Sequence, residues 1–304
     1  MQKITRETVL ILLAFFAIYV IWGSTYFMNK IAVQEIAPLF LSATRFTFAG
    51  FLILIIAKFL KLPLQITKKQ LFNNTLAGFL FLVYGNGVFV WALQYVDSGF
   101  AALEASSMPL VVLIIMRIVY GQKIQKMSLF GVLLGIIGIF LLVVQKEITN
   151  QENSLLGVLM IATCILSWAS ASIFVSKADM HQSYFVNSGY QMFIAGILLF
   201  LFSLLSGEEW KSPLLWNPKT SISMLLLVLF GSIIAFTSFN FLLKKVAPEK
   251  VATSAYVNPI IALFLGYYAL NENITLQSIF AAIILLLGVY FINSNKNKKE
   301  ISKN

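Results

Sequence analysis

The sequence predicts an all-α membrane protein of ten transmembrane helices, arranged as two inverted-topology repeats of five helices each. Three observations lead to this fold class. The 304 residues are 59% hydrophobic and only 11% charged, whereas soluble domains carry about 25% charged residues. Apolar runs long enough to cross a bilayer recur ten times, and the first half of the chain aligns with the second.

The ten predicted spans follow from length and composition. A helix needs about 20 apolar residues to cross the hydrocarbon core, and the connections between the runs are too short to hold a soluble domain. The first run has no small-residue cleavage site, so we interpret it as a retained span rather than a signal peptide. The predicted spans are 9–30, 38–58, 73–95, 99–119, 127–145, 155–176, 185–206, 222–243, 250–269 and 276–293.

The distribution of lysine and arginine predicts the orientation. With the N-terminus inside, 17 of the 22 basic residues fall on the cytoplasmic side, 4 fall on the other side, and Arg45 lies within a span. Such a bias is typical of cytoplasmic loops. We therefore expect a multi-pass protein of the bacterial inner membrane with both termini in the cytoplasm. The net charge of +10 is explained by these clusters, and nucleic acid is not an expected partner.

Two segments of the chain repeat at nearly constant spacing. A shift of about 150 residues places SMPL (107–110) on VNPI (257–260), and a shift of about 146 places SATRFTFAG (42–50) on SGYQMFIAG (188–196). Trp22 falls on Trp168 at the second shift. Chance alignment of apolar helices is the alternative, but three matches in order argue against it.

The repeat divides the chain into a first half over 1–147 and a second half over 153–304. Each half has five spans, and because five is odd, the second half enters the membrane from the opposite side. Inverted repeats of this kind build secondary transporters, with the substrate site near the midplane between the halves. Pro109 and Pro259 occupy equivalent positions in the fourth and ninth spans, where each would bend its helix. Two symmetry-related gates and two static packing kinks are both compatible with these prolines.

Two charged residues lie inside predicted spans, Arg45 in the second and Glu104 in the fourth. Each costs about 2.5–3.5 kcal/mol at a helix centre on insertion scales. Three explanations stay open: a structural ion pair between them, contact of one or both with a substrate in a cavity, and access of Glu104 to water near the helix end. If Arg45 binds a substrate carboxylate, Glu104 is the candidate counter-ion or proton acceptor.

Uncharged polar and aromatic residues outline the rest of the expected cavity. In the first span, residues at i, i+3, i+4 and i+7 share one helical face. Such a stripe also suits an interfacial aromatic belt, and each isolated amide also suits helix–helix hydrogen bonding. The predicted substrate-binding set is Trp22, Thr25, Tyr26, Asn29, Arg45, Tyr84, Asn86, Trp91, Glu104, Trp168, Gln191, Asn240, Tyr256 and Asn258.

Catalytic and metal chemistry find little support in the sequence. One histidine, His181, and one cysteine, Cys164, supply no metal-ligand set and no catalytic pair. No P-loop or dinucleotide-binding glycine motif occurs. We expect no cofactor, no metal site and no enzymatic activity.

These features together resemble the EamA type of the drug/metabolite transporter superfamily. The resemblance rests on WGSTYFMNKIA in the first span, the prolines of spans four and nine, and the residues that follow those spans, YGQKI (120–124) and LNENI (270–274). Gln122 departs from the glutamate that the family more often has, which Glu272 retains. The resemblance implies export or exchange of small metabolites, often amino acids, with spans five and ten outside the substrate-handling core.

The predicted function is secondary transport of small metabolites by alternating access around a midplane cavity. The expected partners are a small-molecule substrate (an amino acid or amphipathic metabolite) and the lipid bilayer. Protons as coupling ion and a homodimer built on Gly131-x-x-x-Gly135 of the fifth span are further hypotheses. A non-transporting membrane scaffold or accessory subunit is the alternative function, and an intramembrane enzyme is less well supported.

Overall fold

The computed structural model describes residues 6–121, 126–144, 153–246, 251–252, 254 and 257–294. Within these ranges the protein is helical and has no β-strand, which confirms the predicted fold class. Seven helical segments are long and apolar enough to cross a membrane, and three shorter apolar helices complete the set of ten. Each segment falls where the sequence predicts a span.

The first half contains five spans, several of which are divided. The first comprises α1 (Arg6–Phe16), the π-helix η1 (Ala17–Ile21) and α2 (Trp22–Val33), and the second is α3 (Pro38–Phe59). The third comprises α4 (Lys68–Gly78), the π-helix η2 (Phe79–Val88) and α5 (Phe89–Ala92). The fourth comprises α6 (Ser98–Ala105) and α7 (Met108–Tyr120). The fifth is α8 (Lys126–Val143).

The second half repeats this pattern. Its spans are α10 (Ser154–Lys177), α11 (Tyr184–Leu205), then α12 (Pro218–Leu226) with the π-helix η4 (Leu227–Phe236) and α13 (Thr237–Lys245), then α15 (Asn258–Leu270) and α16 (Leu276–Ser294). A short 3₁₀ turn, η3 (Pro213–Leu215), lies before α12. The two long π-helices occupy the third span of each half.

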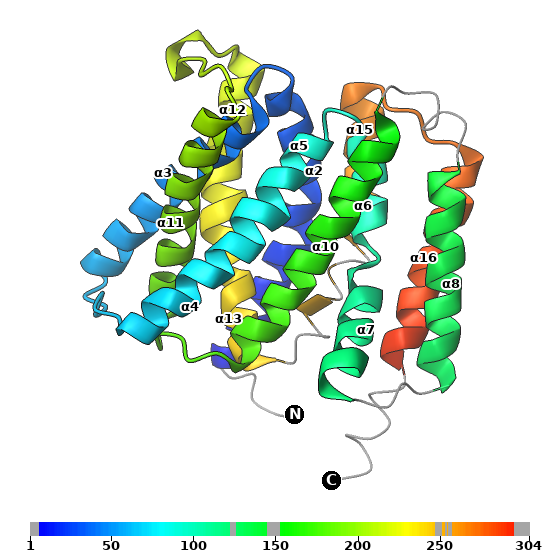
Figure 1. Ribbon diagram of the computed structural model, residues 1–304, viewed down its shortest axis with the longest axis horizontal. Coiled ribbons are helices and arrows are strands. Elements are labelled where there is room, and N and C mark those ends of the chain that lie inside the picture. The colour runs from blue at the N-terminus through cyan, green and yellow to red at the C-terminus, as the bar shows by residue number, and fades with distance from the viewer. Residues whose placement is uncertain are drawn as a thin grey trace.

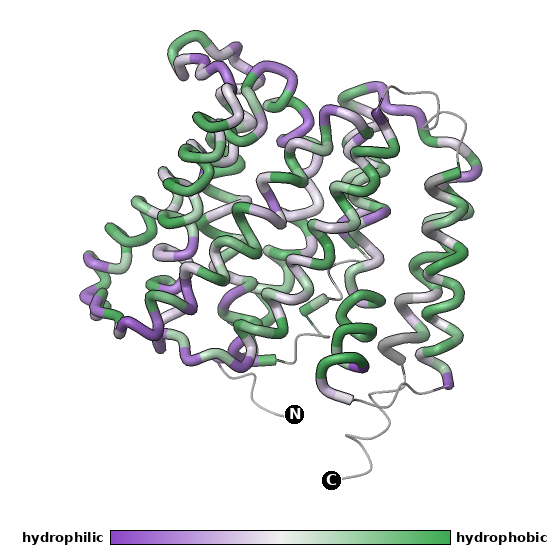
Figure 2. Tube along the Cα trace, in the orientation of Figure 1, coloured by the Kyte–Doolittle hydropathy of each residue, from purple (hydrophilic) through white to green (hydrophobic). Residues whose placement is uncertain are grey.

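The helices form one bundle with two ends (Figure 1). We call the end where α4 begins and α7 and α13 finish the proximal end, and the end where α12 begins the distal end. Hydrophobic residues dominate the middle of the bundle and hydrophilic residues gather toward both ends (Figure 2). This banding is what a lipid-embedded bundle requires. On the predicted orientation the distal end faces outward.

Equivalent spans of the two halves pack against each other. The α3–α11 contact is the closest, because Gly50 and Gly196 face the partner backbone at symmetry-related positions. A Cβ atom at Gly50 would lie 2.7 Å from Phe193 Cα, and one at Gly196 would lie 2.9 Å from Thr47 Cα. Small residues permit this close approach of membrane helices. The crossing therefore depends on two glycines that the repeat aligned.

Methyl groups at these two glycines are expected to destabilise the bundle. Gly50→Ala and Gly196→Ala should each lower stability by about 1–3 kcal/mol, the usual cost of overpacking. Thermal unfolding in detergent measures this loss. Gly135→Ala is the matched control, because its added Cβ would meet Leu110 at an ordinary 3.4 Å. Equal melting temperatures for all three variants would contradict the close-packing argument.

A second glycine contact joins α8 to α16, which lie together at one side of the bundle (Figure 1). A Cβ atom at Gly288 would lie 2.7 Å from Gly131 O and 2.9 Å from Gly135 N. The Gly131-x-x-x-Gly135 motif is therefore used within the chain, against its own tenth span. A contact between protomers through this motif, which the sequence suggested, would have to displace α16.

Three glutamates at the distal end join the halves. Glu208, after α11, accepts hydrogen bonds from the backbone N–H groups of Leu39 (3.0 Å) and Phe40 (2.8 Å) at the start of α3. Glu272, after α15, accepts from the N–H groups of Ser98 (2.9 Å) and Gly99 (3.1 Å) at the start of α6. These free N–H groups and the helix dipole favour a negative charge.

The third glutamate, Glu35, reaches from the first half to the start of α12. It accepts hydrogen bonds from the Asn217 backbone N–H (3.1 Å) and amide side chain (2.6 Å), and it forms an ion pair with Lys211. The hydrogen bond from Lys211 is the main cause that lowers the pKa of Glu35 to about 2. Because the folded pKa is depressed, this contribution to stability is present above the ordinary value of 4.5 and is lost as the pH falls toward 2.

Candidate functional site

A cavity between the two halves is the candidate binding site. About 120 Å³ of it is open to the centres of water molecules, which is enough for several waters at about 10–15 Å³ each. Its lining runs from Asn29 and Phe89 in the distal half of the bundle to Leu243 and Val251 toward the proximal end. Nine residues predicted from the sequence line it: Trp22, Thr25, Tyr26, Asn29, Arg45, Asn86, Trp168, Asn258 and Pro259.

Arg45 supplies the charge of the cavity. Its side chain on α3 is 3% exposed; Nε donates to Ser232 Oγ at 2.7 Å and NH1 donates to Asn29 Oδ1 at 3.4 Å. The guanidinium carbon lies 4.9 Å from the centroid of the Phe46 ring. Among the described residues no carboxylate lies within ion-pair distance of Arg45. Both hydrogen-bond partners are neutral, so the guanidinium keeps its positive charge uncompensated.

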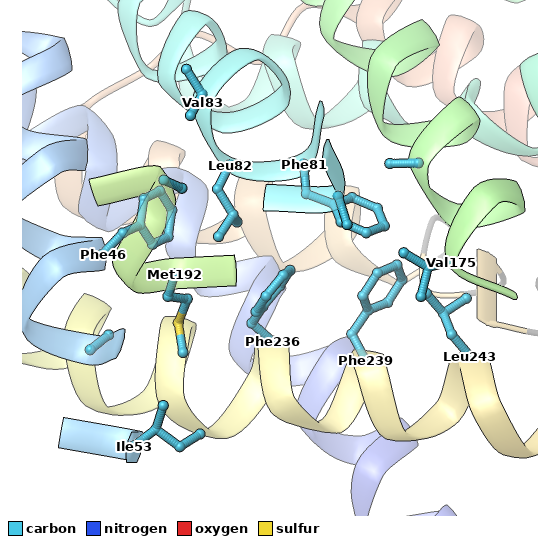
Figure 3. Close-up of a cluster of buried hydrophobic side chains, with 14 of the residues drawn as sticks. Phe46, Ile53, Phe81, Leu82, Val83, Val175, Met192, Phe236, Phe239 and Leu243 are labelled. Carbon is cyan, nitrogen blue, oxygen red and sulfur yellow. The ribbon is translucent and has the colours of Figure 1, made fainter. Parts of the chain in front are cut away.

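Aromatic rings form another part of the lining. Trp22 and Trp168, matched by the repeat, meet edge to face with centroids 5.6 Å apart. Phe239 lies 5.0 Å from Trp22, and Phe81 lies 5.0 Å from Trp168. Figure 3 shows Phe81 facing Phe236 and Phe239 from the other side of the buried hydrophobic cluster. This aromatic wall is therefore suited to an apolar or aromatic part of a ligand.

Two polar atoms at the cavity have no described hydrogen-bond partner. Trp168 Nε1 is a buried donor and Asn86 Oδ1 is a buried acceptor, and both residues line the space. Buried polar groups are normally satisfied by protein or by bound water or ligand. Both residues line the space, but neither atom is exposed to it in this conformation, so a ligand would reach them only after a side-chain movement.

The π-helices border the cavity and leave backbone carbonyl groups free for other spans. Trp22 Nε1 donates to Gly231 O in η4 at 3.1 Å, and Ser167 Oγ donates to Leu80 O in η2 at 2.7 Å. The amide of Asn258, oriented with its nitrogen toward η1, donates to Ile18 O and Tyr19 O. Short π-helical segments inside α-helices frequently occur at functional sites. Here they bind the spans together around the cavity.

Pro109 and Pro259 begin helices instead of bending them. Each is the second residue of its helix, α7 or α15, and Ser106 and Ser107 interrupt the fourth span before α7. Proline is well accommodated at a helix start, where its missing N–H has no partner to lose. Pro259 lines the cavity and Pro109 does not. The starts of α7 and α15, at Met108 and Asn258, both lie at the cavity.

Gln191 and Asn240 lie in a buried polar network rather than in the cavity lining. Gln191 Nε2 donates to Asn74 Oδ1 at 3.0 Å, and Asn240 Nδ2 donates to Gln191 Oε1 at 3.0 Å and to Ser188 Oγ at 2.9 Å. Both amides hydrogen-bond to neighbours on α4 and α11. Gln191 is the repeat equivalent of Arg45, so the two equivalent positions have different surroundings.

Glu104 is buried beside the cavity but outside its lining. The side chain, in the last turn of α6, is 3% exposed, and Oε2 has no hydrogen-bond partner among the described residues. No ion pair joins it to Arg45, so the structural pair considered from the sequence is not formed. Its burial likewise rules out free access to water in this conformation.

The remaining predicted residues lie elsewhere. Tyr84 is 36% exposed, and Trp91 packs against a hydrophobic cluster of α3, α11 and η4. Tyr256 lies outside the described residues. Ser232, which binds Arg45, was not predicted. The repeat could have indicated Ser232. The π-helices η2 and η4 are equivalent in the two halves, and their alignment pairs Ser232 with Tyr84, which was predicted as a site residue.

The EamA-like transporter family model matches the chain twice, over residues 9–144 and 155–294. The chain belongs to this family. The inner membrane transporter YedA of Escherichia coli strain K12 is 33% identical to this EamA-like chain over 287 residues, which are 91% of the chain and 90% of YedA. The family and the bundle of apolar helices establish a multi-pass membrane protein related to transporters.

More distant relatives of this EamA-like chain have similar lengths. The transporter YoaV of Bacillus subtilis strain 168 is 22% identical over 96% of the chain and 99% of its own length. A probable amino-acid metabolite efflux pump of Salmonella typhimurium is 24% identical over 90% of the chain and 91% of its own length. A solved crystal structure that is 17% identical matches with a TM-score of 0.70, covering 97% of this chain and 100% of the other. That likeness shows the shared fold.

Proposed function

We propose that this protein is a secondary transporter that exports or exchanges small carboxylate-bearing metabolites, such as amino acids, by alternating access around the cavity. The observation that carries the proposal is Arg45: a buried cation with no described counter-ion, held at the edge of a cavity large enough for a small solute. A buried charge in a membrane protein is typically found at a substrate or ion pathway.

The broken helices support an anionic group in the same place. The N-termini of α7 and α15 lie at the cavity, and half-helix N-termini in transporters point toward anionic substrate groups. The aromatic wall of Trp22 and Trp168 would hold an apolar part of the molecule. The name of the Salmonella efflux pump, 24% identical, is consistent with an amino acid as cargo.

A flux assay tests the proposal. The purified protein in proteoliposomes should exchange radiolabelled amino acids or related carboxylic acids, while decarboxylated analogues of the same size should neither move nor compete. Empty liposomes and the variant Ala105→Trp, whose added ring fills part of the cavity, are the controls. If no carboxylate in a broad panel moves while an amine or neutral analogue does, the proposed cargo class is wrong.

A coupling proton would use Glu104. It is a buried carboxylate next to cavity-lining Ala105 and Ser106, and it is not held in an ion pair by Arg45. We expect Glu104→Gln to abolish uptake driven by a pH gradient while counterflow exchange continues. Flux measured with and without an imposed gradient separates the two. Gradient-driven uptake that survives the substitution would remove Glu104 as the proton carrier.

A further inference from the structure

The two ends of the bundle differ chemically even though the fold repeats. At the distal end, Glu35, Glu208 and Glu272 each cross from one half to a helix N-terminus of the other. At the spacings of the repeat, the equivalent residues in the other half are His181 for Glu35, Leu62 for Glu208 and Gln122 for Glu272. None of those three residues is a carboxylate. The repeat therefore places no carboxylate at the positions equivalent to these three glutamates.

The distal contacts are numerous and directional. Glu272 accepts from two backbone N–H groups and also from the Ser98 hydroxyl at 2.7 Å, and Glu208 accepts from two N–H groups and from the Ser203 hydroxyl at 2.6 Å. A hydrogen bond to a charged group is roughly twice as strong as one between neutral groups. Pulling α3 or α6 away from the second half would leave the carboxylate and two helix donors without these partners.

Hydrogen bonds between the halves also occur toward the proximal end, but the described ones join neutral groups, as from Asn73 Nδ2 to Asp179 O at 2.8 Å and from the Tyr190 hydroxyl to Leu64 O at 3.1 Å. The ion pair between the halves at this end, Lys245–Glu7 at 2.7 Å, has side chains that are 45% and 57% exposed. Exposed pairs of this kind contribute about 0–1 kcal/mol. Buried hydrophobic clusters lie toward both ends, so the hydrogen bonds of the distal glutamates are the main difference between the two ends.

We infer that Glu35, Glu208 and Glu272 form a distal clamp that holds this end shut and sets the balance between the two access states. The inference rests on the proposed function, since opening of the distal end is the second half of the transport cycle. A membrane carrier whose carboxylate-to-helix links between the halves lie at one end should rest with that end closed. Removing a clamp residue should therefore populate the distally open state.

Thiol labelling in lipid nanodiscs tests the clamp without any substrate. Both membrane faces are accessible there, so the result does not depend on orientation. With Cys164 replaced by Ala, a reporter cysteine at Ala32, which is 0% exposed in the distal cluster, reports distal opening to a small polar maleimide. Glu208→Gln and Glu272→Gln should each raise its labelling rate about tenfold or more, because a tenfold shift in population needs only about 1.4 kcal/mol.

Two controls separate opening from loosening. Glu7→Gln removes the proximal carboxylate and should leave Ala32→Cys labelling unchanged. A second reporter at Ala57, which is 0% exposed in the proximal half of α3, should stay protected in the clamp variants. Unchanged labelling at Ala32→Cys in both clamp variants, or an equal rise at Ala57→Cys, would overturn the inference. If the clamp variants label faster at Ala32→Cys but the protein moves no carboxylate, the clamp stands and the proposed cargo is wrong.

Discussion

Replacing Arg45 by glutamine should raise the apparent KM for a carboxylate substrate about 10- to 100-fold. Hydrogen bonds to a charged group contribute about 1.5–3 kcal/mol, and each 1.4 kcal/mol corresponds to a factor of ten in affinity. Glutamine can still bind Asn29 and Ser232, but it brings no charge to the cavity. Concentration-dependent flux in proteoliposomes gives the KM directly.

Stability distinguishes a binding role of Arg45 from a structural one. Removing one member of a buried ion pair is strongly destabilising, but Arg45 has no described acidic partner. Arg45→Gln should therefore leave the melting temperature unchanged or raise it. Arg45→Lys is the matched variant: it keeps the charge and loses the planar fork, so an intermediate KM is expected. Unchanged transport in normally inserted Arg45→Gln protein would remove Arg45 from the site.

Filling the cavity should stop transport altogether. Ala105 lines the cavity in the fourth span, and an indole at this position would project into the space that a substrate needs. We expect Ala105→Trp to reduce flux at least 100-fold while the protein still inserts, because the added ring enters open space rather than a packed core. Initial rates of exchange at saturating substrate measure the effect.

A lipid-facing tryptophan provides the matched control for this block. Ala162 on α10 is exposed on the outside of the bundle, so Ala162→Trp adds the same side chain without touching the cavity. Its flux should remain near that of the unmodified protein. Normal exchange by Ala105→Trp would mean that the substrate follows another route through the bundle.

The positions of the spans could be predicted because they depend on the length of apolar runs, which is a property of the local sequence. Gly50 and Gly196 were aligned by the repeat and indeed face each other's helices. Arg45, Trp22 and Trp168 line the cavity, as expected from their charge, their aromatic rings and their positions in the repeat. The charge of an arginine inside a span and the small size of a glycine can both be read from a single sequence.

Other features depend on contacts between distant segments and could not be predicted. The π-helices arise where another span supplies a donor for a freed carbonyl group, as Trp22 does for Gly231. The prolines were expected to bend continuous helices, but the break at Ser106 and Ser107 makes Pro109 part of a new helix start. Gln191 and Asn240 are polar and inside spans, yet only their neighbours show that their hydrogen bonds are used up.

The glycine contact between α8 and α16 has a consequence for how such a protein can diversify. The two helices secure each other through Gly131, Gly135 and Gly288, at a distance from the groups that surround the cavity. A substitution at Asn86, which lines the cavity, therefore leaves the glycine contact between α8 and α16 in place. The residues that line the cavity and the glycines that join α8 to α16 can therefore vary separately within one chain.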